Sequence, residues 1–337
     1  MLLRSRLSSF VTVCAAASAV SGWSCARAPV TAGPYFGEKP PGPRAALFAP
    51  GIVSTAMDER DIAVTPYGQE IYWAALAPGH GLGTIMVSRQ TDSGWAPPRV
   101  VPRMGDPSVM RIEPAISPDG RQLFFTVVPP AAVGGFQDAD IWVTERTKTG
   151  WGTARRLDGP INTDGGEFFA SPTRDGTLYF TREPRDGQNA GIYRARSADG
   201  KYAEPERLPV QVNAGTARFN AFVDRDERYV IVPILGRPDS LGGVDYYVVF
   251  RNADDTWTEP VNLGSQVNTP GSQEYSPYVS PGGKYFFFMS SRTANAPKTL
   301  TYKFFLDQMG RPRNGSADIY WMDAGFIEKL RPGGAGQ

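Results

Sequence analysis

One short pattern occurs five times along the chain, and it constrains the fold more than any other feature. In each copy a strand-like segment ends in a turn of the Pro-Asp-Gly kind, and an aromatic-rich segment follows. The turn has a physical basis, because proline presets its own φ and Asp-Gly accepts the positive φ of a tight hairpin. The aligned turn positions are Tyr67, Asp119, Asp175, Asp226 and Gly282, which are spaced by 52, 56, 51 and 56 residues.

Each copy continues with a second signature, Asp-Ile-Tyr or a close variant, as at residues 140–143 and 318–321. In most copies a further strand follows, opened by its own turn. The 37 glycines and 30 prolines punctuate these short segments and argue against a helical bundle. Four strands per copy make one propeller blade. We therefore predict an all-β protein, a single β-propeller of four-stranded blades with five blades, and with six as the alternative.

The two ends of the repeat region complement each other. The last copy lacks its fourth strand, and residues 45–55 resemble the fourth strand and following link of another copy, residues 156–163. We expect this N-terminal strand to complete the last blade and close the ring. The last copy also carries an insertion at residues 293–317, in which residues 300–309 are expected to form a short helix.

The first 25 residues have the features of a secretory leader. Arg4 and Arg6 form a basic start without acidic residues, and a moderately apolar stretch follows. Both cysteines, Cys14 and Cys25, lie in this leader. Cys25 is a lipidation candidate, with cleavage elsewhere in the leader as the alternative. We expect an exported protein, either periplasmic or an outer-membrane-anchored lipoprotein. The expected organisation is a leader at 1–25, a Pro/Gly-rich approach at 26–44, the propeller at 45–332 and a tail at 333–337.

Composition excludes several classes of function. The formal net charge is +1, so the chain lacks the excess of basic residues that is typical of a nucleic-acid-binding protein. The single histidine, His80, lies in a Pro-Gly-His-Gly loop and excludes metal sites that need two or more histidines. The acidic residues of the repeats are scattered, without the dense spacing of a calcium loop. We expect no metal and no cofactor, and any catalysis would rest on carboxylates or arginines.

One column of the repeat alignment is charged in all five copies. Eight residues before each turn position it reads Glu59, Arg111, Glu167, Arg218 and Glu274. Because the inner strand of each blade lines the central channel, we expect a ring of alternating sign at the channel mouth. Two interpretations remain open. The ring is either a polar site that binds a ligand, or a set of mutual salt bridges that fixes the register of the blades.

The repeated Ser-Pro-Asp-Gly-x-x-Leu-x-Phe and Asp-Ile-Tyr/Trp signatures resemble the WD40-like repeats of TolB-like propeller proteins, over about residues 35–332. The resemblance implies export from a bacterial cell. It also implies a binding or scaffolding role without assigned catalysis.

We therefore predict first a non-enzymatic propeller that binds an envelope protein, or a glycan or peptidoglycan-associated ligand. The alternative is a glycoside-acting enzyme that uses channel carboxylates, with Glu59, Glu167 and Glu274 as candidates. Neighbouring arginines argue against it, because they would lower carboxyl pKa values where a general acid needs a raised one. A third interpretation is a calcium-dependent, lactonase-like propeller.

Overall fold

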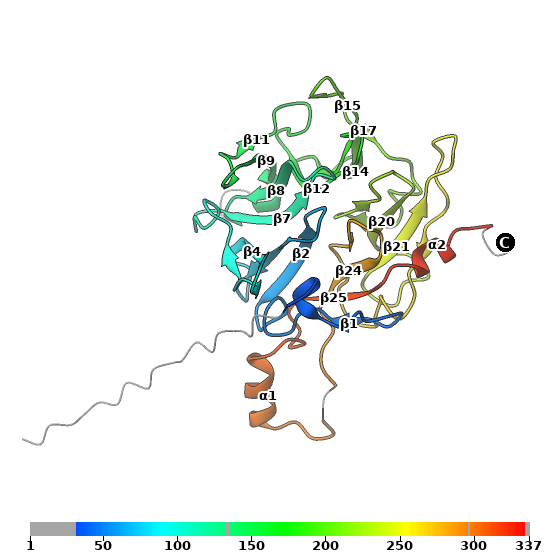
Figure 1. Ribbon diagram of the computed structural model, residues 1–337. Coiled ribbons are helices and arrows are strands. Elements are labelled where there is room, and N and C mark those ends of the chain that lie inside the picture. Colours follow the sequence, from blue (N-terminus) through cyan, green and yellow to red (C-terminus); the bar gives the residue numbers. More distant parts are fainter. Residues whose placement is uncertain (1–31, 132–134, 296, 334–337) are drawn as a thin grey trace, which may run out of the picture.

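The computed structural model describes residues 32–131, 135–295 and 297–333. The predicted leader, with both cysteines and the lipidation candidate Cys25, lies outside these residues, as does the tail from residue 334. The described chain forms five antiparallel sheets arranged around one axis as a five-bladed β-propeller (Figure 1). The prediction of an all-β propeller of five blades is confirmed, and the six-bladed alternative is not realised.

The strands of each blade follow one another outward from the axis. The first blade contains β2 (Asp58–Val64), β3 (Glu70–Leu76), β4 (Gly83–Thr91) and β6 (Arg99–Val100), with β5 (Gly94–Trp95) also paired to β4. The second contains β7 (Met110–Ile116), β8 (Gln122–Val128), β9 (Asp140–Thr147) and β11 (Arg155–Arg156), with β10 (Gly150–Trp151) also paired to β9. The third contains β12 (Gly166–Pro172), β13 (Leu178–Glu183), β14 (Gly191–Ala195) and β17 (Glu206–Arg207), beside the small hairpin of β15 (Ser197–Ala198) and β16 (Lys201–Tyr202).

In the fourth blade the inner strand is divided into β18 (Ala217–Arg218) and β19 (Phe222–Val223), followed by β20 (Tyr229–Leu235), β21 (Val244–Phe250) and β22 (Val261–Asn262). The fifth contains β23 (Tyr278–Val279), β24 (Tyr285–Ser290), β25 (Asp318–Asp323) and β1 (Ala46–Leu47). The helical segments are short: η1 (Tyr35–Gly37), η3 (Gly135–Asp138), α1 (Tyr302–Met309) and α2 (Phe326–Lys329). In the described part of the chain no helix has the length and apolar character needed to cross a membrane.

The ring is closed by the N-terminal strand, as predicted. Strand β1 pairs with β25 in antiparallel register, Ala46 opposite Trp321 (Figure 1). The fifth blade therefore takes its outer strand from the other end of the described chain. Phe48, which follows β1, is fully buried, and its ring centroid lies 5.0 Å from that of Phe287 and 5.1 Å from that of Trp321. Aromatic packing thus holds the two ends of the repeat region together.

The cores lie between neighbouring blades. Successive residues of a strand point to opposite faces of its sheet, so consecutive aromatic residues serve two different cores. Phe124 packs with Phe180 and Tyr193 on the side of the third blade. Phe125 packs with Tyr72 on the side of the first blade. The paired aromatic residues of the repeat therefore join each blade to both of its neighbours.

The five turns that follow the inner strands all lie on one face of the propeller, which we call the turn face. Inner strands run toward it, because each begins with the alignment column that includes Glu59 and ends at the turn that includes Tyr67 or its equivalent. The insertion of the fifth blade connects β24 to β25, and the helix predicted within it is α1. Its position in the loop after the second strand of the blade places it away from the turn face.

We predict that Phe48→Ala lowers the free energy of unfolding by about 3–5 kcal/mol, because it removes a fully buried aromatic ring from the seam that closes the propeller. Urea unfolding followed by tryptophan fluorescence measures the change. Val210→Ala is the matched control, since Val210 is 69% exposed and should change stability little. Equal stability of the two variants would show that the N-terminal strand does not close the ring.

Candidate functional site

Every blade places one residue in a left-handed backbone conformation at the same point of its inner segment. These residues are Asp61, Glu113, Phe169, Asn220 and Ser276, with φ between 50° and 64°. Such φ values are uncommon outside glycine and are retained where the surroundings enforce them. In β2, β7 and β12 the strand pairing shifts register at this point, as in a β-bulge. The same irregularity in all five blades indicates that the position has a common role at the axis.

Side chains at and beside these positions form a closed cycle of hydrogen bonds. Glu113 Oε1 accepts from Arg60 Nη2 at 2.9 Å and from Asn220 Nδ2 at 3.3 Å. Asn220 Nδ2 also lies 3.3 Å from Ser276 Oγ, which in turn donates to Asp61 Oδ1. Arg60 Nε donates to Asp61 Oδ2 at 2.8 Å and completes the cycle. Four blades contribute these side chains, and all five groups are buried.

The third blade joins the cycle through its backbone. Glu113 Oε2 accepts from the backbone N–H of Phe169 at 2.8 Å and from Thr126 Oγ1 at 2.6 Å. One carboxylate therefore accepts four hydrogen bonds, and it connects the second blade to the first, third and fourth. Four donors match the capacity of an ionised carboxylate, so these hydrogen bonds favour the charged form of Glu113 and oppose the effect of burial on its pKa.

The charges of this cluster do not balance. Arg60, Asp61 and Glu113 are each less than a tenth exposed, and with both carboxyl groups ionised their net charge is −1. Burial raises the pKa of both carboxyl groups; repulsion from Asp61 adds to the rise at Glu113, whereas Arg60 opposes it. Because a buried net charge is unfavourable, the pair is expected to retain one proton. Glu113 accepts four hydrogen bonds and Asp61 accepts them from Arg60 and Ser276, so the larger number of donors to Glu113 favours Asp61 as the position of that proton.

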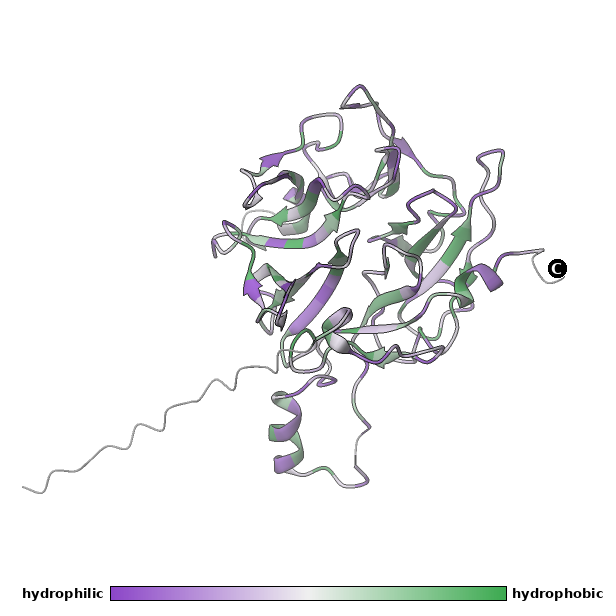
Figure 2. Ribbon diagram, viewed as in Figure 1, coloured by the Kyte–Doolittle hydropathy of each residue, from purple (hydrophilic) through white to green (hydrophobic). Residues whose placement is uncertain are grey.

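A small cavity borders the pair. It has a volume of about 40 Å³, and its lining includes Asp61, Glu113, Arg225 and Tyr278. The lining residues lie in the second halves of the inner segments, so the cavity is on the turn-face side of the axis. It has room for about one water molecule, whose share of liquid volume is roughly 30 Å³. Figure 2 shows β2, the strand that carries Asp61, as hydrophilic over much of its length.

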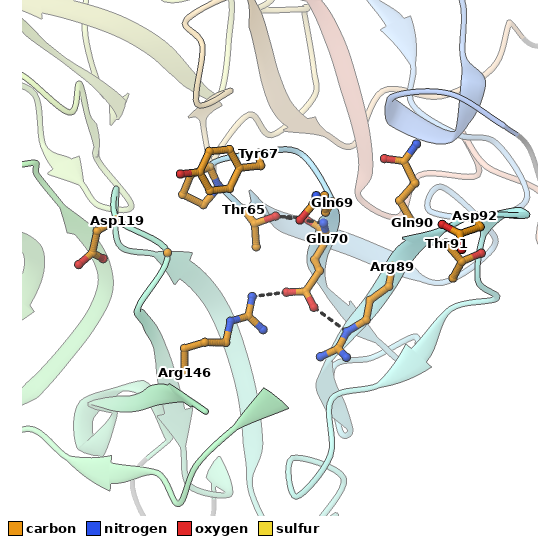
Figure 3. A pocket seen from close by; sticks show the side chains of 12 residues that line it. Thr65, Tyr67, Gln69, Glu70, Arg89, Gln90, Thr91, Asp92, Asp119 and Arg146 are labelled. Atoms are coloured by element: carbon orange, nitrogen blue, oxygen red, sulfur yellow. Dashed lines mark hydrogen bonds and ion pairs between the residues drawn. The ribbon is translucent and has the colours of Figure 1, made fainter. Parts of the chain in front are cut away.

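A second, larger pocket of about 620 Å³ lies on the turn face between the first two blades (Figure 3). Glu70 lies between two guanidinium groups: Arg89 Nε is 2.6 Å from Glu70 Oε1, and Arg146 donates to Glu70 Oε2. Arg146 in turn stacks over the Trp151 ring at 4.1 Å. Although burial opposes it, the hydrogen bond from Arg146 lowers the pKa of Glu70. Tyr67 lies on the rim and is 87% exposed.

The column predicted from the sequence lies nearer the other face, where the inner strands begin. Its three glutamates are fully buried, and each accepts hydrogen bonds from a threonine of the preceding link: Glu59 from Thr55, Glu167 from Thr163 and Glu274 from Thr269. Burial raises the pKa of Glu59 to about 7, although the bonds from Thr55 oppose the rise.

The two arginines of the column have other partners. Arg111 pairs with Asp106, with 3.6 Å between Nη2 and Oδ2, and Arg218 donates to the carbonyl oxygen of Ala190 at 2.5 Å. Among the described residues, no ion pair joins two members of the column. His80 lies at this same end, with Nε2 2.8 Å from Asp58 Oδ2. Within residues 32–131, 135–295 and 297–333, no group of three or more His, Cys, Asp or Glu side chains could hold a metal ion.

The axis cluster, as we call the cycle of Arg60, Asp61, Glu113, Asn220 and Ser276, lies one or two positions further along the same alignment. The sequence analysis did not predict it. Six residues before the turn, the column reads Asp, Glu, Phe, Asn and Ser, which share neither charge nor size. The one available signal was the presence of Asp61 and Asn220, since these two residue types tolerate the left-handed conformation better than most.

No protein-family model and no curated protein matches the sequence. Solved structures match in fold. A glycoside hydrolase matches with a TM-score of 0.52 and 12% identity, over 86% of this chain and 93% of the other. A family 117 glycoside hydrolase from the marine bacterium Zobellia galactanivorans gives 0.49 and 12%, over 84% and 90%. A putative TolB from Agrobacterium tumefaciens gives 0.43 and 17%, over 79% and 90%. At these identities the similarity shows the propeller fold alone.

These findings overturn two predictions, that of a non-enzymatic binding module and that of no enzymatic activity. Both are corrected, because the solved structures that share this fold include a glycoside hydrolase, so the propeller fold does not indicate a non-enzymatic protein. The physical reason concerns the pKa values of the carboxyl groups. The prediction relied on the repeat signatures and on arginines expected to lower the carboxyl pKa values of the column, whereas burial raises the pKa values of Glu59, Glu167 and Glu274.

We predict that Arg60→Met lowers the free energy of unfolding by about 3–5 kcal/mol at neutral pH, because it leaves two buried carboxyl groups without their cation. Without the guanidinium their folded-state pKa values rise further above the unfolded values. The folded state of the variant is then favoured at low pH and loses stability as pH rises. The difference in the free energy of unfolding between wild type and Arg60→Met should therefore become smaller toward pH 5. Chemical unfolding at several pH values measures it.

The matched control for this test is Arg121→Met, since Arg121 has a side chain that is 85% exposed and pairs only with Asp119 on the surface. It should change stability little at any pH. If the loss of unfolding free energy in Arg60→Met were independent of pH, the ionisation of Asp61 and Glu113 would not depend on this guanidinium.

Proposed function

We propose that the protein is an enzyme that acts on glycosides, with Asp61 and Glu113 as its acid and base pair. The observation that supports this most is the convergence of two carboxyl groups, from neighbouring blades, on one guanidinium beside a cavity at the propeller axis. Cleavage of a glycosidic bond uses two carboxyl groups of which one carries a proton and the other is ionised. Environments that push two pKa values apart produce that division.

The hydrogen bonds support a division of roles between the two carboxyl groups. Glu113 accepts four hydrogen bonds, which favour its negative charge, so it would stabilise the positive charge that develops on the sugar ring. To take the proton of the attacking water as general base, it would first release one of these four donors. Asp61 carries the proton and would give it to the leaving oxygen. Arg60 contacts both carboxylates and fixes their relative position. These groups are rigid before substrate binds, which is the condition for electrostatic stabilisation of a transition state.

Access would come from the turn face. The cavity has room for the attacking water, but a sugar ring needs more than its 40 Å³. Arg225 and Tyr278, which line the cavity, are only partly buried, and we propose that they move aside as the scissile bond approaches. The larger pocket on the same face would hold a neighbouring sugar unit, with the exposed ring of Tyr67 as a stacking surface and Arg89 as a hydrogen-bond donor.

The cellular setting is also a proposal. The composition of residues 1–25 supports export, with Cys25 as the candidate for lipidation, and an envelope glycan would then be the substrate within reach. The repeat signatures support a place among the TolB-like propellers for the fold of the chain.

We predict that Asp61→Asn lowers glycoside turnover at least 100-fold while the protein stays folded. Asparagine keeps the shape of the side chain, and its oxygen still accepts from Arg60. Release of reducing sugar from a panel of oligosaccharides, neutral and acidic, measures turnover, and thermal unfolding followed by circular dichroism measures the fold. Glu113→Gln is the second variant, with a loss of similar size.

Glu227→Gln is the matched control, because Glu227 is another buried carboxylate that pairs with an arginine, Arg251, at 2.7 Å, but lies away from the axis cavity. It should keep the turnover of wild type. The proposal fails if no member of the panel is cleaved, or if a folded Asp61→Asn protein cleaves its substrate as fast as wild type.

A further inference from the structure

Helix α1 is an amphipathic helix whose apolar side is left exposed by the residues that the structure describes. Four of its five large apolar residues follow the i, i+3, i+4, i+7 pattern of a single stripe, and all four are exposed: Tyr302 79%, Phe305 52%, Leu306 51% and Met309 71%. The fifth, Phe304, lies outside the stripe and is partly buried. Not one residue of the helix is buried. An amphipathic helix of a globular protein normally buries such a stripe against the core. This stripe therefore lacks the contact that its pattern requires.

The helix is nevertheless well defined at its start. Thr301 caps the N-terminus, its hydroxyl accepting from the backbone N–H of Phe304 at 3.1 Å. On the polar side, Lys303 pairs with Asp307 at 2.9 Å, four residues apart. Figure 1 shows α1 standing off the propeller within the insertion, and Figure 2 shows its hydrophilic and hydrophobic sides. A helix of eight residues is marginal alone, so an outside partner for the stripe would stabilise it.

The charge around the stripe is strongly one-sided. Residues 297–317 contain four basic side chains and one acidic side chain, a net charge of +3. The whole chain has a formal net charge of +1, so the remainder carries −2. The basic residues Lys298, Lys303, Arg311 and Arg313 are all exposed. The positive charge of the molecule is thus concentrated beside its most exposed apolar stripe.

We propose that α1 and its basic flanks dock on an anionic lipid surface. The apolar stripe would enter the boundary between headgroups and acyl chains, and the lysines and arginines would lie against the lipid phosphates. A second copy of this chain is a poorer occupant, because pairing two stripes would bring two segments of net charge +3 together. The proposal is independent of the glycoside chemistry at the axis, since it involves a separate segment and no carboxyl group.

The test is co-sedimentation of the purified full chain with lipid vesicles. Cys25→Ser is introduced throughout, so that no acyl chain contributes to binding. Vesicles of phosphatidylcholine alone are compared with vesicles that also contain phosphatidylglycerol, at low and at high salt. We expect binding to the anionic vesicles only, and loss of binding at high salt, because salt screens the contribution of the basic residues.

The double variant Phe305→Ser/Leu306→Ser removes the centre of the stripe, and we expect about a tenfold or greater loss of binding, since membrane affinity scales with buried apolar area. Val210→Ser is the control, an exposed apolar residue elsewhere that should bind like wild type. Both changes are at exposed positions, so folding is retained. Equal binding to neutral vesicles, no binding at all, or unchanged binding by the double variant would overturn the proposal. So would a dimer in solution that the double variant abolishes, because the stripe would then belong to a second copy.

Discussion

The guanidinium of Arg60 holds together the part of the molecule where all five blades meet. It bonds to Asp61 and to Glu113, and the hydrogen bonds of these two carboxyl groups extend the contact to every other blade. Aromatic packing between blades and the pairing of β1 with β25 close the outer part of the ring. Neither of those contacts reaches the axis. Four of the five left-handed residues belong to the cycle, and the fifth, Phe169, donates its backbone N–H to Glu113, so these hydrogen bonds offset the cost of the left-handed backbone.

The same cluster connects stability to chemistry. One cation and two anions in a buried place favour a state in which the two carboxyl groups hold one proton between them. A proton held in this way at neutral pH is what a general acid needs, and an ionised carboxylate fixed beside it is what a developing cation needs. The proposed acid–base chemistry therefore requires no histidine. Its turn face supplies the larger pocket in which a substrate could be held.

Much of the fold could be predicted from the sequence, because its determinants are local and repeated. The turns, the missing fourth strand of the last copy and the helix of the insertion each leave a pattern in nearby residues. The position of the axis cluster leaves no such pattern. Regular alternation along a strand assigns residues to faces, but the bulge at Asp61 and Glu113 breaks that alternation. The column with Glu59 could be recognised in the sequence because all its members are ionisable, whereas the column six residues before the turns contains charged, polar and aromatic residues. The function was harder to predict, since one fold serves many activities.

The most direct test of this account is the titration of the two axis carboxyl groups by carbon-13 NMR, with Asp61→Asn and Glu113→Gln used to assign the signals. We expect one of the two groups to keep the chemical shift of a protonated carboxyl well above the ordinary carboxyl pKa of about 4, and the other to remain ionised over the same range. If both groups instead lose their protons in the ordinary range, the cluster holds no proton at neutral pH. The proposed division into acid and base would then be wrong.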